Sequence, residues 1–315
     1  MSQPVVIGLS AVVMGLREGE LAALAVRHDG LPGLPFGPFA PEGSRTFELA
    51  LRAFVAAQTG FDLGYVEQLY TFGDQGRDAP LADVGAGAAR VVSVGYLALT
   101  ATAADAARPD ASWLRLYKVF PWEDWRQGRP PTLDRIAEAL RPWIDQAPEA
   151  DARAPRRDRV EALLALGDGR WNEERVLERY ELLYEAGLVA EAARDHASAP
   201  AAAAGELGVA MLSDHRRILA TALGRLRGKL KYRPVIFELT PAEFTLSELQ
   251  RAVEATAGVP LHKGNFRRMV ERTGLVESVG RLSSATGGRP AELFRASPET
   301  RTLRSGTGIS LPLAG

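Results

Sequence analysis

The stretch RVVSVGYLALT, at residues 90–100, most restricts the folds open to this chain, because it is almost continuously apolar and rich in β-branched side chains. A run of this length and composition predicts a strand buried within a sheet. Aromatic and β-branched residues between turn signals predict further strands at residues 5–15, 20–26, 65–72 and 113–120. An amphipathic helix lies between the second and third of these strands, so the pattern predicts an α+β sandwich domain.

That helix is predicted within residues 37–61, GPFAPEGSRTFELALRAFVAAQTGF. Its apolar stripe follows helical spacing and consists of Phe47, Leu51, Phe54 and Val55. Ser44 or Thr46 is suited to cap the start of the helix, and Gly60 is suited to end it. Taken alone, the pattern requires no more than an ordinary amphipathic helix.

The middle of the chain is predicted to be helical, with helices at residues 130–140, 156–166, 172–186 and 212–230. The alanine-biased run at 190–208 contains Pro200 and Gly205, so it is interpreted as a linker rather than a packed helix. Asp214 and His215 open the last of these helices, where they are expected to act as a cap and to lie on the surface.

The C-terminal part of the chain, after the helical middle, has a different order of predicted elements. Thr245 and Glu248 have the spacing of a capping box, which predicts a helix that continues to about residue 256. Beyond the break at residues 258–260, the pattern predicts a second helix, a strand, a glycine-rich loop and a strand, at residues 261–273, 275–279, 280–290 and 291–295. Two helices joined by a tight turn and followed by a β-hairpin form a winged helix-turn-helix.

Charge is unevenly distributed along the chain. Residues 224–304 hold 15 Lys and Arg against 8 Asp and Glu, a balance of +7. Since the whole chain carries −1, the remainder carries −8. This segregation of charge predicts that the C-terminal part binds a polyanion. The alternative interpretation is a basic surface that is only solvated.

The composition also excludes several classes of site. There is no cysteine, which excludes disulfides and zinc sites built on sulfur, and the four histidines are not at metal-ligand spacing. No apolar run reaches the roughly 20 residues of a membrane span. The first residues lack the basic region of a signal peptide. A cytoplasmic protein without membrane contact is therefore expected, with length enough for two domains.

Eight polar or cationic residues of the winged motif are candidate DNA contacts: Thr245, Ser247, His262, Lys263, Asn265, Arg267, Arg268 and Arg289. Helical spacing places Lys263 and Arg267 on one face. Asn265 has the geometry to pair with adenine, and arginine to pair with guanine. The others are candidate phosphate or minor-groove contacts, although capping is the main role expected for Thr245. The alternative for this helix is a basic solvated surface.

The predicted helix at 37–61 resembles the Nudix motif in outline, G-x5-E-x7-R-E-U-x-E-E-x-G-U, where U is a bulky aliphatic residue. With Gly60 as the last glycine, the adjacent glutamates that hold Mg²⁺ in Nudix hydrolases fall on Ala57 and Gln58. Neither side chain supplies a carboxylate. The sequence therefore predicts a Nudix-like domain with no catalytic residues and no metal site, and a protein that is not an enzyme.

Motifs elsewhere extend this resemblance: YVEQLYTFGD at 65–74, FPWEDWR at 120–126, FTLSELQ at 244–250, KGNFRR at 263–268 and GRPAELF at 288–294. Together they resemble Nudix-related transcriptional regulators of NAD metabolism, of the NrtR and NadQ-like type. The resemblance implies a homodimeric repressor of NAD biosynthesis or salvage genes that binds a double-stranded DNA operator. It also implies a nucleotide effector such as NAD or ADP-ribose, and no required cofactor.

The implied architecture is α+β, with an N-terminal Nudix-like α/β/α sandwich domain, a helical middle segment and a C-terminal winged helix-turn-helix. The expected boundaries are 1–145 for the sensor domain, 146–210 for the helical insert and linker, 211–297 for the long helix with the winged helix, and 298–315 for a flexible tail.

Candidate ligand contacts are cations for a pyrophosphate and aromatic rings for adenine: Arg52, Tyr70, Phe72, Arg77 and Arg90. At least one of Tyr70 and Phe72 is expected to pack in the core. The alternative function is a Nudix-type pyrophosphatase of ADP-ribose or a similar dinucleotide, with other carboxylates such as Glu42, Glu48 or Glu67 as metal ligands.

Overall fold

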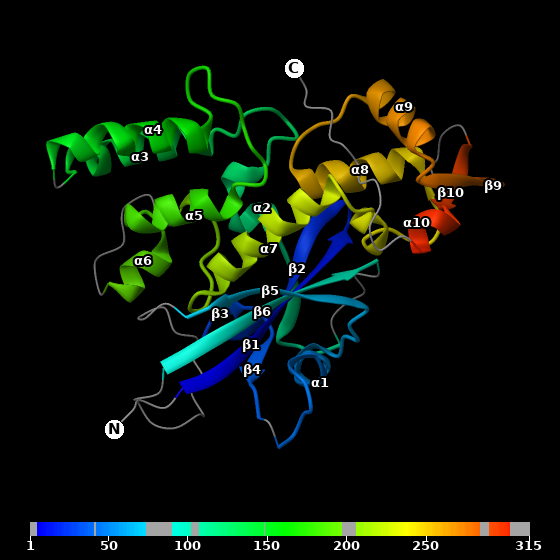
Figure 1. Cartoon of the computed structure of the whole chain (residues 1–315), viewed down its shortest axis with the longest axis horizontal. Helices are drawn as coiled ribbons and strands as arrows, with labels where there is room; N and C mark the ends of the chain where they lie inside the picture. Colours follow the sequence, from blue (N-terminus) through cyan, green and yellow to red (C-terminus); the bar gives the residue numbers. More distant parts are fainter. Residues whose placement is uncertain are drawn as a thin grey trace.

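A computed structural model of the chain describes residues 5–40, 42–73, 90–101, 107–147, 149–196, 206–283 and 290–302. Its elements form a sheet domain, a layer of helices and a small winged unit near the C-terminus (Figure 1). The predicted mixed α+β class is therefore confirmed.

The described part of the N-terminal domain is built on a seven-stranded mixed sheet. Two long strands at its centre, β1 (Val5–Arg17) and β6 (Arg90–Thr100), run parallel over their common length. On the other side of β1, β2 (Glu20–His28) pairs with its C-terminal half and β4 (Phe36–Pro38) with its N-terminal half. The remaining strands are β5 (Tyr65–Phe72), antiparallel to β6, and two partners of β2, namely β3 (Leu31–Gly33) and β7 (Ala111–Arg115).

Helices cover both faces of this sheet, which explains why its central strands are apolar along their whole length. The side chains of β1 alternate between two buried clusters. Leu9, Ala11 and Val13 lie under α1 (Phe47–Thr59). Val12 and Met14 lie in the other cluster, under α7 (His215–Leu230). The buried strand predicted at residues 90–100 is confirmed as β6.

Helix α1 begins and ends as its sequence predicts. The Thr46 hydroxyl accepts a hydrogen bond from the Leu49 N–H at 3.2 Å, which satisfies one of the free donors of the first turn. Gly60 ends the helix with φ at +73°, a left-handed conformation that favours glycine. Leu51 and Val55 are fully buried against the sheet.

The strand predicted at residues 113–120 is wrong in its second half. β7 ends at Arg115, and Leu116–Val119 forms the short helix α2, followed by the 3-10 turn η1 (Pro121–Glu123). Leu116, Val119 and Phe120 belong to one buried cluster. A helical turn brings such closely spaced residues to the same side, whereas a strand would point alternate residues to opposite faces.

The helical middle consists of α3 (Thr132–Asp145), the 3-10 turn η2 (Ala150–Ala152), α4 (Arg153–Leu164), α5 (Val176–Glu185) and α6 (Ala190–Asp195). Helix α4 packs on α3, and α5 packs on α7. No helix in the described ranges is long and apolar enough to cross a membrane.

The linker predicted at residues 190–208 is wrong at its start, because α6 is a packed helix. The small side chains of Ala192 and Ala193 are buried in it. The carboxylate of Glu191 is also buried, where it pairs with Arg216 at 3.3 Å and accepts a hydrogen bond from the Met211 N–H. These tertiary contacts outweigh the linker-like composition.

The winged unit contains η4 (Val235–Glu238), β8 (Phe244–Thr245), α8 (Leu246–Ala257), α9 (Lys263–Thr273), β9 (Val276–Ser283), β10 (Ala291–Ala296) and α10 (Pro298–Thr302). Its strands form a three-stranded sheet of order β8-β10-β9. The flexible tail predicted from residue 298 is wrong for residues 298–302. The helix α10 is held there by the Thr300 hydroxyl, which donates to the Leu275 carbonyl at 3.1 Å.

A buried ion network joins the winged unit to the rest of the chain. The carboxylate of Glu123 accepts hydrogen bonds from Arg179 of α5 and Arg227 of α7, both at 2.6 Å, and all three side chains are at most 1% exposed. Arg227 also donates to the Thr256 carbonyl at the end of α8. A Cβ atom on Gly258 would lie 2.5 Å from the Glu123 carbonyl oxygen, so glycine permits this close approach.

His215 is a second buried connection, and the surface position predicted for it is wrong. Its Nδ1 accepts a hydrogen bond from the Leu34 N–H at 3.0 Å, which ties the turn between β3 and β4 to the start of α7. Burial, with smaller contributions from the charges of His28 and Arg194, lowers the pKa of His215 to about 3.

Acid is expected to destabilise the fold through His215. Its folded-state pKa of about 3 lies below the ordinary value of 6.5, so the unfolded chain binds more protons between these pH values. Stability should therefore fall as pH drops from 6.5 towards 3, by up to ~1.4 kcal/mol per pH unit for one proton. In His215→Gln, whose amide oxygen still accepts a hydrogen bond, thermal unfolding midpoints should depend less on pH in this window. An unchanged dependence would contradict this assignment.

Candidate nucleic-acid interface and ligand pocket

Helix α9 is amphipathic, with one buried and one exposed face. Its buried face consists of Phe266, Met269 and Val270, as the sequence predicts. The predicted contacts Lys263, Asn265, Arg267 and Arg268 are all exposed on the outer face. The helix packs on α8 and projects from the upper right of the molecule, away from the large sheet (Figure 1).

The exposed face of α9 contains a preformed polar pair and two further cations. The Arg268 guanidinium donates to Asn265 Oδ1 at 2.6 Å, which fixes the orientation of both side chains. Lys263 and Arg267, one turn apart, form no salt bridge with any part of the chain that the structure describes. Two such cations on one helix face suit phosphate oxygens and the acceptor edge of guanine.

The other predicted DNA contacts differ in their positions. Ser247 is exposed in the first turn of α8, and His262 is exposed immediately before α9. Thr245 is 3% exposed, and its hydroxyl and N–H complete a capping box with Glu248. Thr245 therefore has the capping role that was expected as its main one, and its side chain is not presented at the surface for a DNA contact. Arg289 lies outside the described residues.

Gln58 of helix α1, which the predicted Nudix alignment places at a glutamate position, contributes to internal packing. Gln58 Nε2 donates to the Phe36 carbonyl at 2.6 Å, and Gln58 Oε1 accepts from the Phe36 N–H at 3.2 Å. This pair of bonds holds β4 against α1. Ala57, at the neighbouring glutamate position, is exposed. The Gln58 amide thus satisfies both backbone groups of Phe36.

The carboxylates considered for an alternative metal site lie apart. Glu48 forms a salt bridge with Arg52 on α1 at 2.8 Å. Glu67 lies on β5 and binds Lys229 of α7, on the opposite face of the sheet. Glu42 is exposed in the loop before α1. Within the residues that the structure describes, no three His, Asp or Glu side chains come together as metal ligands.

Those predicted ligand contacts whose side chains the structure describes, Arg52, Tyr70 and Phe72, do not form one site. Arg52 reaches from α1 to the carbonyls of Leu63 and Gly64, beside the start of β5. Tyr70 and Phe72 lie towards the other end of β5, where Phe72 is buried under Arg217 of α7. Tyr70 is exposed and packs edge-on against Phe72. The backbone of Arg90 begins β6, and Arg77 lies outside the described residues.

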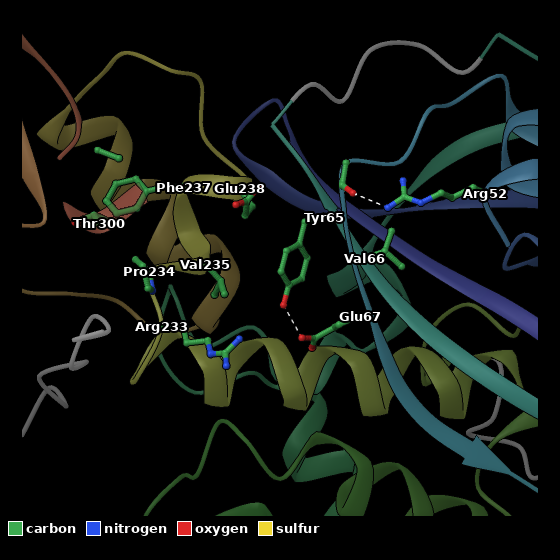
Figure 2. Close-up of a pocket in the computed structure, with 12 residues that line it drawn as sticks. Arg52, Tyr65, Val66, Glu67, Arg233, Pro234, Val235, Phe237, Glu238 and Thr300 are labelled. Atoms are coloured by element: carbon green, nitrogen blue, oxygen red, sulfur yellow. Dashed lines mark hydrogen bonds between the residues drawn. The ribbon is translucent and has the colours of Figure 1, made fainter. Parts of the chain in front are cut away.

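A pocket of about 660 Å³ instead opens at the start of β5, where the sheet domain meets the winged unit. Its walls come from β5 and α1, from the segment that leads out of α7, and from the end of β10 with α10 (Figure 2). The polar and aromatic residues that line it include Arg52, Tyr65, Glu67, Arg233, Phe237 and Glu238. A pocket of this size is within the range of small-molecule sites.

Hydrogen bonds connect one wall of the pocket to α7. The Tyr65 hydroxyl donates to Glu67 Oε2, and the same oxygen binds Lys229. Burial and the hydrogen bond to Glu67 raise the pKa of Tyr65, so its hydroxyl stays protonated at neutral pH. Glu67 Oε1 is buried without a hydrogen-bond partner.

Of the predicted ligand contacts, Arg52 lines this pocket, and so does Glu67, which the sequence suggested only as an alternative metal ligand. Tyr65 and Glu67 lie within the motif YVEQLYTFGD, but nothing in the motif indicates which side chains face a cavity. Arg233 and Phe237 lie between the long helix and the winged unit, where no periodic pattern marks them. The alternation of Tyr65 and Glu67 on one face of β5 is the only sequence signal that could have paired them.

Comparison with known proteins finds a family that the C-terminal unit matches. Residues 236–296 match the family described as the NrtR DNA-binding winged helix domain. The ADPR responsive transcriptional repressor NtrR of Acinetobacter baylyi is 40% identical over 82 residues, which are 26% of this chain and 32% of that protein. The chain thus matches about a third of the length of this curated relative.

Solved structures extend the likeness to the whole chain at the level of the fold. NrtR from Shewanella oneidensis superposes with a TM-score of 0.54 at 22% identity, over 95% of this chain and 99% of that chain. The same protein in complex with a 27mer DNA gives a TM-score of 0.52. A MutT/nudix family protein from Enterococcus faecalis gives 0.52 at 15% identity, over 94% and 89% of the two chains.

These likenesses confirm the predicted resemblance to Nudix-related regulators of the NrtR type. Residues 236–296 match the family of NrtR DNA-binding winged helix domains, and the chain as a whole has the fold of NrtR from Shewanella oneidensis.

Proposed function

We propose that this chain is a ligand-responsive transcriptional repressor that binds double-stranded DNA through α9. The observation that carries the proposal is the exposed basic face of α9 in a segment that matches a DNA-binding winged helix family. The relative from Acinetobacter baylyi is named a repressor, which supports repression rather than activation. The motif resemblance supports NAD biosynthesis or salvage genes as targets, and DNA as partner supports a cytoplasmic location.

The proposed contacts divide into base-reading and phosphate-binding groups. Lys263, Asn265, Arg267 and Arg268 enter the major groove, while Ser247 and His262 face phosphates. The candidate contact Arg289 would add a wing contact. A homodimer places two such helices about 34 Å apart, on successive turns of a near-palindromic operator.

The proposed effector is a nucleotide of NAD metabolism, such as ADP-ribose or NAD, that binds without being cleaved. The relative is described as ADPR responsive, which supports this ligand class. The Gln58 contacts with Phe36 and the separation of Glu48 from Glu67 support a protein that is not a hydrolase. The effector acts by shifting the populations of DNA-competent and DNA-incompetent dimers.

We also propose a separate role for each of three segments of the chain. Residues 1–145 form the sensor, 146–210 the helical insert and 211–297 the long helix with the winged helix. Helix α7 contacts α5, β5 and α8, so it is placed to transmit a change from the sensor to the DNA-binding unit.

A gel-shift experiment with the full chain and its own upstream DNA tests the proposed function. Specific retention should occur at moderate salt, and log K should fall linearly with log salt because phosphate contacts release counterions. Incubation of the same preparation with ADP-ribose and Mg²⁺ or Mn²⁺ should yield no AMP. Robust turnover without DNA retention would replace the repressor with the pyrophosphatase.

A further inference from the structure

Arg268 lies at the centre of the exposed face of α9. The buried face of this helix consists of Phe266, Met269 and Val270. A step of about 100° per residue puts Gly264 and Arg268 opposite these three, one turn apart on the same line. Because Gly264 has no side chain, the surface beside the Arg268 guanidinium is helix backbone, which a base pair can approach closely.

The helix itself binds one edge of the Arg268 guanidinium. The Nε atom donates to the Gly264 carbonyl at 3.3 Å, and Nη2 donates to Asn265 Oδ1 at 2.6 Å. In the planar guanidinium, the N–H of Nε and one N–H of Nη2 are parallel and form the same edge. The two bonds within α9 therefore fix the plane of the guanidinium relative to the helix.

The second edge of the Arg268 guanidinium remains available. It consists of one N–H of Nη1 and the other N–H of Nη2, and neither group has a partner in the part of the chain that the structure describes. Two parallel N–H donors match the O6 and N7 acceptors that guanine presents in the major groove. Adenine presents N7 beside an N6 donor, so its amino group would face one of these N–H donors.

The amide of Asn265 is not placed to pair with adenine. Such a pair requires the amide oxygen to accept from adenine N6 while the amide nitrogen donates to N7. Since arginine has donors only, the Asn265 atom that faces Arg268 must be Oδ1. Although Oδ1 has a second lone pair, an N6 amino group on it would meet the cationic N–H groups of Arg268. The two side chains together therefore present hydrogen-bond donors to DNA.

We propose that Arg268 reads one guanine in each half-site of the operator, and that Asn265 is a positioning residue that orients Arg268 instead of pairing with adenine itself. This inference rests on the proposed function, since it concerns the same helix and the same DNA. It identifies the base pair that faces the middle of α9 as guanine with cytosine.

Selection of binding sites from randomised double-stranded DNA by the full chain tests this inference without a known operator. Arg268→Ala should lower the preference for guanine over adenine at one position of each half-site by about tenfold or more. Asn265→Ala should relax the same position. Asn265→Asp should restore the preference, because a carboxylate also accepts from Arg268. Arg272→Ala is the matched control, since Arg272 is an exposed arginine in the last turn of α9, and it should keep the wild-type preference.

A base analogue provides a second measurement. Replacing the selected guanine with 7-deazaguanine, which lacks the N7 acceptor, should weaken binding by the wild type severalfold and leave binding by Arg268→Ala unchanged. The inference is overturned if Arg268→Ala relaxes no guanine position, or if Asn265→Ala relaxes a separate adenine position. Failure of Asn265→Asp to restore the preference would overturn the positioning role of Asn265. Enrichment of no sequence by the wild type would instead overturn the proposed function.

Discussion

Replacing Glu123 with alanine is expected to lower the free energy of unfolding by ~3–5 kcal/mol, because it leaves two buried guanidinium groups without a counter-ion. Burial alone would raise the pKa of Glu123, but the charges and hydrogen bonds of Arg179 and Arg227 hold that pKa below its ordinary value. The carboxylate is therefore ionised at neutral pH. Urea unfolding followed by tryptophan fluorescence measures the effect, since Trp122 and Trp171 lie beside the network.

The matched control for this prediction is Glu178→Ala. Glu178 lies on α5, where it pairs with Arg175 at 2.5 Å, but its side chain is 52% exposed. Removal of such a surface pair should change stability by ~0–1 kcal/mol. Equal losses in the two variants would show that the Glu123 network is no more stabilising than a surface ion pair.

Loss of Glu123 should also loosen the winged unit. Arg227 donates to the Thr256 carbonyl, and the Tyr117 hydroxyl donates to the Ala255 carbonyl at 2.7 Å, so the network holds the end of α8. Without Glu123 the Arg227 side chain loses its fixed orientation. Faster limited proteolysis between α7 and α8 in Glu123→Ala than in Glu178→Ala would accompany the loss of stability.

Local sequence signals were sufficient where one element determines its own ends. The Thr46 cap and Gly60 stop of α1 are local, and so is the capping box of Thr245. The apolar run of β6 is also local, because burial on both faces requires a continuous pattern. These elements formed as predicted, including the buried and exposed faces of α9.

Predictions failed where distant contacts decide the outcome. Glu191 lies in an alanine-rich run, and only its pairing with Arg216 makes α6 a packed helix. His215 was predicted to lie on the surface, because nothing near it in the sequence indicates that the Leu34 N–H is its hydrogen-bond partner. The pocket at the start of β5 combines this strand with residues around 233–238, and this juxtaposition follows from how α7 crosses the sheet. Periodicity and composition carry no information about such pairs.

The double variant Lys263→Ala, Arg267→Ala is expected to reduce operator affinity on the order of 10²-fold or more, since each lost contact to phosphate or guanine costs ~1–3 kcal/mol. Both side chains are exposed and lack salt bridges in the described structure, so the fold should be unaffected. The slope of log K against log salt should also become shallower, by about one for each phosphate contact removed.

Arg153→Ala, Arg157→Ala is the matched control, because it removes two exposed cations at the same four-residue spacing from α4. Both doubles lower the net charge of the chain by two, so a general electrostatic effect would weaken DNA binding equally. Position-specific contacts would weaken it only in the α9 variant. Equal affinities of the two doubles, with unchanged thermal midpoints, would show that α9 does not read the operator. A selective loss in the α9 variant would place DNA recognition on this helix rather than on basic charge in general.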